Sequence, residues 1–197
     1  MDRRAFLAAL PALGLAGCAR ASVAVEGKAA LLLKGAHSQI SKTLAYDPAY
    51  TRIPYPNGDV PLEKGVCTDV VIRAYRTIGI DLQQRVHEDM AANFRLYPKA
   101  WGLKRPDSNI DHRRVPNLQV FLTRFGRSLP VSQNPEDYTP GDLITNLPGG
   151  RPHIAIVSEV RSTLTKRLMV VQNIGLGTQL NDDLLSYPMT GHYRYAV

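Results

Sequence analysis

The chain has 197 residues, of which 44% are hydrophobic and 21% are charged, and its formal net charge at pH 7 is +7. This length suffices for one domain with its own hydrophobic core, and the composition excludes an intrinsically disordered protein. The positive charge suits anionic surfaces such as cell wall or lipid headgroups. We do not expect nucleic-acid binding, because no compact block of Lys and Arg with interleaved aromatic residues is present.

The first 18 residues have the features of a bacterial secretion signal. Two arginines precede a short apolar segment, which ends in Leu15-Ala16-Gly17-Cys18. The apolar segment is too short to span a bilayer, and its last four residues resemble a lipobox, whose cysteine becomes lipidated. We therefore expect residues 1–18 to be a lipoprotein-type signal peptide with a lipidated Cys18. The protein would then be exported and anchored in the periplasm or cell envelope. The alternative is a plain signal peptide with an incidental cysteine.

Residues 19–39 are interpreted as a tether and N-terminal segment ahead of one folded domain, residues 40–197. The domain begins with a segment rich in Pro, Tyr and turn residues, from Tyr46 to Pro61, which predicts a fixed loop. The tyrosines of this loop either line a pocket or cover the edge of the core.

A helix is predicted to begin at or beside Cys67. Apolar residues recur downstream at helical spacing, and Gly79 supplies a stop signal. Unpaired N–H groups at a helix N-terminus favour an anion. We therefore expect the pKa of this thiol to fall from about 8.5 toward the range of roughly 3.5–7.5 of activated cysteines. The alternative is an inert buried thiol. If Cys18 is lipidated, Cys67 is the one free thiol of the mature chain, which favours a functional role.

Two further helices and then several strands are expected downstream. Apolar positions at helical spacing occur within residues 82–97 and 118–125. After Pro140 the pattern changes to short β-type segments separated by turn residues. These strands are expected at 143–147, 152–157, 168–174 and 191–197. Helices followed by strands predict an α+β fold with an antiparallel sheet.

Cysteine catalysis needs a base that takes up the thiol proton and a polar group that orients the base. His153 begins a predicted strand, and Gln172 and Asn173 lie on the next strand. A cysteine on a helix, a histidine on a strand and an amide on the neighbouring strand occur in this order in papain-like folds. The candidate catalytic residues are Cys67, His153 and either Gln172 or Asn173, because alternation along a strand turns only one amide toward the site.

Several longer motifs resemble known families. Cys67 at a helix start, Pro140-Gly141-Asp142-Leu143 and His153-Ile154-Ala155-Ile156-Val157 are similar to the pattern of NlpC-type cell-wall peptidases and amidases. Residues 40–197 resemble more closely the bacterial family called domain of unknown function 1287. The motifs that match it lie at 55–61, 65–70, 109–118, 173–175 and 191–195.

Two positions depart from these patterns. Ala155 replaces the usual glycine, a small change that we expect to be tolerated. Gln172 replaces a histidine that is common in the second family, but an amide can still accept a hydrogen bond from the imidazole N–H.

The resemblance implies a papain-like, NlpC-type α+β fold in which N-terminal helices pack on an antiparallel sheet. It also implies a thiol hydrolase, a peptidase or amidase, that cleaves amide bonds of peptidoglycan stem peptides. Cys67 would attack the carbonyl carbon, His153 would shuttle the proton, and the Cys67 backbone N–H would help bind the oxyanion. No cofactor and no metal ion is expected. The expected partners are peptidoglycan or peptide substrate and, through the lipid anchor, a membrane. We expect a monomer.

Five further residues are candidates for substrate binding. They are Tyr46, Tyr55, Asp69, His112 and Arg113. The tyrosines belong to the loop before Cys67, and His112 and Arg113 lie in a polar segment whose arginines are suited to grip a carboxylate. This polar segment is alternatively a salt-bridged clasp between helices.

Two other functions compete with the thiol hydrolase. A metal hydrolase would use Asp111, His112 and His153, but no His-x-x-x-His or paired-cysteine spacing supports it. A non-catalytic envelope lipoprotein that binds cell-wall peptides on a degenerate hydrolase scaffold is the second alternative, which the unusual Gln172 keeps open.

Overall fold

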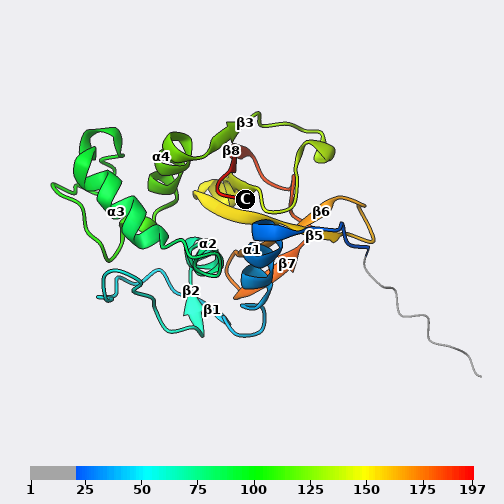
Figure 1. Cartoon of the computed structure of the whole chain (residues 1–197), viewed down its shortest axis with the longest axis horizontal. Coiled ribbons are helices and arrows are strands. Elements are labelled where there is room, and N and C mark those ends of the chain that lie inside the picture. The colour runs from blue at the N-terminus through cyan, green and yellow to red at the C-terminus, as the bar shows by residue number, and fades with distance from the viewer. Residues whose placement is uncertain (1–20) are drawn as a thin grey trace, which may run out of the picture.

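The computed structural model describes residues 21–197 of the chain. These residues fold into four α-helices and a six-stranded antiparallel sheet, besides shorter elements (Figure 1). The expected signal peptide and Cys18 lie outside the described residues. The helices are α1 (Gly27–His37), α2 (Cys67–Arg76), α3 (Leu82–Ala92) and α4 (Val115–Phe125). The sheet has the order β3 (Arg127–Leu129), β8 (Met189–Arg194), β4 (Leu143–Asn146), β5 (His153–Arg161), β6 (Leu168–Asn173) and β7 (Thr178–Asn181). The predicted α+β class, with helices before an antiparallel sheet, is confirmed.

Helix α2 is the central helix of the fold. Every residue from Cys67 to Tyr75 is buried, and the helix packs against α1 and against strands β5 and β6. The Asp69 carboxylate accepts the backbone N–H of Val66 at 2.7 Å, which satisfies one of the free donors at the helix start. The chain turns away after the helix through Gly79, whose φ is +76°. The helix predicted from Cys67 to the glycine is therefore confirmed.

The two faces of the sheet carry two separate hydrophobic clusters. On β5, Ile154 and Ile156 join the larger cluster with the helices, whereas Ala155 and Val157 join a smaller cluster on the opposite face. This alternation follows from the two-residue period of a strand. By the same alternation, His153 lies on the face of Ala155 and Val157, at the first residue of β5.

Helix α1 belongs to the folded unit, although its residues were expected to form the tether and N-terminal segment. Leu32, Leu33 and Ala36 are buried in the larger cluster, and the Gln39 side chain donates to the Val70 carbonyl at 2.9 Å. The packed core therefore begins ahead of residue 40.

Some elements differ from the prediction. Helix α3 ends at Ala92, and a 3₁₀ turn at Phe94–Leu96 continues the chain where one longer helix was predicted. Strands β3 and β7 were not predicted, because both are short and neither has an apolar alternation. Two-residue strands, β1 (Ala45–Tyr46) and β2 (Lys64–Gly65), pair in parallel at the two ends of the predicted loop.

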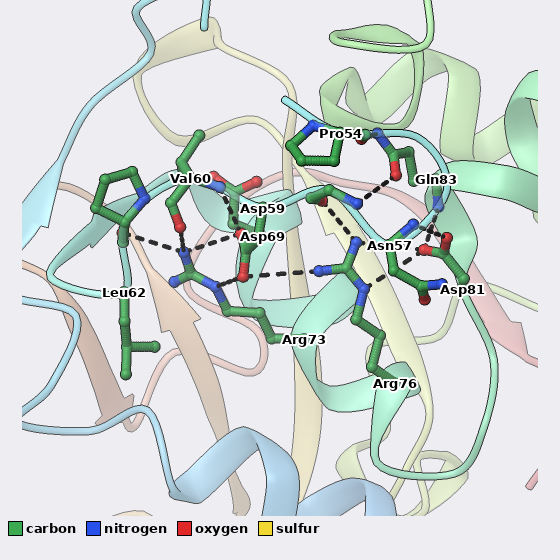
Figure 2. Close-up of polar contacts among 12 residues, drawn as sticks. Pro54, Asn57, Asp59, Val60, Leu62, Asp69, Arg73, Arg76, Asp81 and Gln83 are labelled. Atoms are coloured by element: carbon green, nitrogen blue, oxygen red, sulfur yellow. Dashed lines mark hydrogen bonds and ion pairs between the residues drawn. The ribbon is translucent and has the colours of Figure 1, made fainter. Parts of the chain in front are cut away.

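Two arginines of α2 hold this loop in place (Figure 2). Arg73 donates to the Asp59 carboxylate at 2.8 and 3.1 Å, and Arg76 donates to the Gly58 carbonyl at 2.7 Å. Arg73 also donates to the Thr43 hydroxyl and to the carbonyls of Val60, Pro61 and Lys64, at 3.0–3.3 Å. The helix that begins with Cys67 therefore also sets the shape of the loop that leads to it.

Among residues 21–197, no helix is both long enough and apolar enough to cross a membrane.

Candidate active site

Cys67 is the first residue of α2, and its side chain is almost completely buried, with 3% of the residue exposed. Burial raises the pKa of its thiol to about 11. The hydrogen bonds that the backbone N–H groups of Ile154 and Thr68 make to the sulfur oppose this shift only in part, and the nearby Asp69 carboxylate adds to it. The lowered pKa expected from a helix N-terminus is therefore wrong for this structure, because desolvation outweighs the stabilisation by backbone N–H groups.

Tyr46, on β1, brings a hydroxyl to the thiol. Burial and the neighbouring Cys67, including a hydrogen bond between the two side chains, raise the pKa of Tyr46 to about 12. The residue remains 39% exposed, so it lies between the buried sulfur and the solvent. A neutral phenol hydroxyl at this place can donate a hydrogen bond to an oxygen beside the sulfur.

His153 is the first residue of β5, directly before the strand residue whose N–H contacts the Cys67 sulfur. The imidazole Nε2 lies 2.8 Å from Oε1 of Gln172 on β6, and both residues are buried. Burial lowers the pKa of His153, which the Gln172 hydrogen bond opposes. The imidazole is therefore neutral at pH 7.

Gln172 and Asn173 point in opposite directions, as alternation along a strand requires. Gln172 contacts His153, whereas Asn173 Nδ2 donates to the carbonyls of Ala45 at 3.2 Å and Gly65 at 3.0 Å. The amide beside the imidazole is thus that of Gln172. Asn173 ties β6 to β1 and β2, the strands that carry Tyr46 and lead to Cys67.

Within residues 21–197 no hydrogen bond joins the Cys67 thiol directly to the His153 imidazole. The two are neighbours through Ile154, and both are neutral at rest. Catalytic hydrogen bonds are often long in a protein without substrate and shorten when substrate binds. The geometry therefore corresponds to a resting thiol and imidazole rather than a preformed thiolate–imidazolium pair.

Two clefts meet at Tyr46 and Pro152, which line both. One cleft, of about 490 Å³, is lined by His153, Arg151 and Ile174 among others. The other, of about 200 Å³, reaches Cys67 and is bordered by Trp101 and Arg114. Cys67 and His153 therefore line two different clefts, and Tyr46 borders both clefts.

Comparison with known proteins gives a consistent assignment. The family described as "Domain of unknown function (DUF1287)" matches residues 33–195. The chain belongs to this family. It is 54% identical over 164 residues to a protein of Escherichia coli (strain K12) named "Uncharacterized protein YijF", a match that covers 83% of this chain and 80% of that protein.

A solved structure, "Structure of NlpC2 from Trichomonas vaginalis", is similar to this DUF1287 member with 14% sequence identity and a TM-score of 0.39. The match covers 87% of this chain and 48% of that one, so the chain spans about half the length of the solved structure.

Asp69 and Arg113 of this DUF1287 chain form a salt bridge with each other. Arg113 donates through Nε and Nη2 to the two carboxylate oxygens of Asp69, both at 2.9 Å, and both side chains are buried. Arg113 also donates to the carbonyls of Asp47 and Ala49 at 3.3 Å. The bidentate pair joins the start of α2 to the 3₁₀ turn at Asp111–Arg113, which precedes α4, and the carbonyl contacts join this turn to the loop before α2. It is the salt-bridged clasp between helices that the sequence left open as an alternative to carboxylate binding.

His112 and Tyr55 lie outside both clefts. His112 is buried, and burial lowers its pKa to about 3. Tyr55 is 42% exposed and packs edge-on against His87, with ring centroids 5.1 Å apart. Of the five candidates for substrate binding, Tyr46 and Arg113 border the cleft that contains Cys67, and only Tyr46 has its polar group beside the sulfur.

Sequence patterns gave no indication of several residues that the fold brings to the site. Trp101 and Arg114 line the cleft of Cys67, with the Arg114 guanidinium 4.2 Å from the centre of the Trp101 ring. Asp183 follows the unpredicted β7 and accepts a hydrogen bond from Gln172. Arg114 lies in the motif at 109–118, but neither Trp101 nor Asp183 lies in a motif that would mark it. Among residues 21–197, no three His, Cys, Asp or Glu side chains are grouped so that they could hold a metal ion.

Proposed function

We propose that the protein is an exported thiol hydrolase that cleaves amide bonds in peptidoglycan stem peptides, with Cys67 as nucleophile and His153 as base. The observation that carries the proposal is the placement of Cys67 at the start of α2, against the first residues of β5, where Gln172 holds the imidazole at 2.8 Å. Nucleophile, base and orienting amide thus come from three elements that pack together.

The proposed reaction begins from the neutral pair. His153 Nε2–H donates to Gln172 Oε1, which leaves Nδ1 free to accept the thiol proton while the sulfur attacks the carbonyl carbon. The Cys67 backbone N–H, at the helix start, and the Tyr46 hydroxyl stabilise the oxyanion. The C–N bond then breaks, the amine leaves with the proton from His153, and water hydrolyses the thioester.

The two clefts support a peptide as substrate. They share Tyr46 and Pro152, one contains Cys67 and the other His153, so a peptide bound across both would pass the sulfur and the imidazole. Arg151 borders one cleft and Arg114 the other. Positive charge on both sides suits stem peptides, which carry several carboxylates.

Digestion of purified peptidoglycan tests the proposal. The full chain should release fragments with new amino and carboxyl termini, which mass spectrometry identifies. Cys67→Ala and His153→Ala should each lower the rate at least a hundredfold while thermal unfolding shows that they remain folded. Treatment with iodoacetamide at pH 10, where the thiol begins to ionise, should abolish cleavage, and a chelator should not. Cleavage that survives Cys67→Ala but not the chelator would instead establish a metal hydrolase.

A second candidate function is a non-catalytic protein that binds cell-wall peptides. It is favoured by the buried thiol, whose pKa is raised to about 11, and by the missing hydrogen bond between Cys67 and His153 within the described residues. It predicts that peptidoglycan binding survives Cys67→Ala and that no product forms between pH 5 and 10.

Export and lipidation at Cys18 are part of the proposal and rest on the lipobox-like sequence alone. Labelled palmitate should be incorporated into the wild-type protein in growing cells. Cys18→Ser should remove the label and release the protein from the membrane fraction. A wild-type protein that incorporates no label would overturn the lipid anchor.

A further inference from the structure

Asp183 lies behind the amide that contacts the imidazole. Its carboxylate Oδ2 accepts a hydrogen bond from Gln172 Nε2 at 2.8 Å, equal in length to the bond between Gln172 Oε1 and His153. Gln172 Nε2 also donates to Asn181 Oδ1 at 3.3 Å. His153, Gln172 and Asp183 therefore form a continuous hydrogen-bonded row that runs from β5 across β6 to the segment after β7.

A glutamine on its own is an ambiguous partner for a histidine. Its amide presents an acceptor on one side and a donor on the other, and the two orientations have almost the same shape. With Oε1 toward the imidazole, His153 must carry its proton on Nε2, so Nδ1 is the free base. With the NH₂ group toward the imidazole, the proton moves to Nδ1 and the base is lost.

Asp183 removes this ambiguity. An ionised carboxylate can only accept hydrogen bonds, so the side of Gln172 that faces it must be the NH₂ group. The reversed amide would place Oε1 of the buried Gln172 against the negative charge of the half-buried Asp183. Asn181 Oδ1, as a second acceptor on the same side, favours the same orientation.

We propose that Asp183 is a positioning residue of the active site. Its carboxylate fixes the Gln172 amide so that His153 keeps its proton on Nε2, and its negative charge stabilises the imidazolium that forms when the thiol proton is transferred. The catalytic importance of this tautomer rests on the proposed function. The hydrogen-bonded row does not.

The contacts of Asp183 separate this role from general support of the loop. Among residues 21–197, Gln172 is the one side chain to which its carboxylate hydrogen-bonds. The adjacent Asp182 instead accepts from the Thr165 hydroxyl at 2.7 and 2.9 Å and from the Ser162 hydroxyl. Asp182→Ala is therefore a matched control, because it removes the same charge one residue away without contact to Gln172.

The tautomer can be measured without any substrate. In the full chain labelled with ¹⁵N-histidine, the two ring-nitrogen shifts of His153 should identify the Nε2–H form in the wild type. Asp183→Ala should lower the fraction of this form, and Asp182→Ala should leave it unchanged. Asp183→Asn offers Gln172 a donor as well as an acceptor, so it should fix the tautomer less firmly than the wild type does. Since Asp183 is the charged group that raises the pKa of His153, Asp183→Asn should also lower that pKa.

Activity provides the second readout. Asp183→Ala should reduce peptidoglycan cleavage about ten- to a hundredfold, by analogy with groups that orient a metal-ligating histidine, whose removal has effects of this size. In a Gln172→Leu background the same substitution should have almost no further effect, because Asp183 acts through Gln172. An unchanged His153 tautomer in Asp183→Ala, or equal effects of Asp182→Ala, would overturn the inference. A shifted tautomer supports it even if the wild type cleaves no peptidoglycan, which would count against the proposed function alone.

Discussion

The thiol of Cys67 illustrates how two local effects of opposite sign compete at one residue. The helix N-terminus and two backbone N–H groups stabilise a thiolate, but burial destabilises it more strongly, and the Asp69 carboxylate adds to the penalty. The imidazole of His153 is kept neutral by the same burial. In the proposed reaction the thiol proton is therefore transferred to His153 during the attack, because no thiolate is present at rest.

This resting state predicts the pH dependence of alkylation. With a pKa of about 11, well below one per cent of Cys67 is thiolate at pH 7.5, so iodoacetamide should react far more slowly than with a free cysteine peptide. The rate should rise about tenfold per pH unit from pH 8 to 10, measured by intact-protein mass. A plateau reached below pH 8 would show a preformed thiolate–imidazolium pair and would contradict the resting state described here.

At the scale of elements, α2 connects the core to the site. One face packs on the sheet, its first residue is the candidate nucleophile, and its arginines hold the loop that presents Tyr46 (Figure 2). Asn173 adds a link from β6 to both ends of this loop. The positions of Tyr46 and Cys67 are thus coupled through one helix and one strand.

Arg73→Lys tests this coupling. A lysine cannot reproduce the planar fork that reaches a carboxylate and several carbonyls at once, and the buried carbonyls lose their partner. We expect a loss of about 2–3 kcal/mol in the free energy of unfolding, measured by urea denaturation. Arg127→Lys, at an exposed position of β3, should cost less than about 0.5 kcal/mol. Equal effects of the two substitutions would show that Arg73 does not anchor the loop.

At the scale of the whole molecule, buried neutral histidines make the fold sensitive to acid. The pKa of His112 is lowered to about 3, against roughly 6.5 in an unfolded chain, so the unfolded state binds the proton more readily. The stabilisation is fully present above pH 6.5 and is lost as the pH falls toward 3. The lowered pKa of His153 acts in the same direction.

His112→Gln should make the stability of the protein less dependent on pH. The free energy of unfolding should fall by about 1 kcal/mol less between pH 6.5 and 5.5 than it does in the wild type, because one proton-binding group is missing from the unfolded chain. Urea denaturation at the two pH values gives the difference. A wild-type stability that does not change over this interval would contradict the buried neutral state of His112.

Much of the fold follows from the sequence, and the exceptions have physical reasons. The helix from Cys67 and the strand from His153 were predictable because hydrophobic periodicity and turn residues coincide there. The choice between Gln172 and Asn173 required the register of β6 against β5, which periodicity does not provide. The thiol pKa depends on burial, and the contact of Asp183 depends on β7, a strand without an apolar pattern.

The measurement that tests the central proposal most directly is detection of an acyl group on Cys67. The full chain is mixed with purified stem peptides, quenched in acid within one turnover, and its mass is determined. The proposed mechanism predicts an adduct with the mass of the acyl half of the substrate, attached to Cys67 and absent in Cys67→Ala and His153→Ala. Cleavage of the peptides without an adduct, and undiminished in Cys67→Ala, would contradict nucleophilic catalysis by this residue.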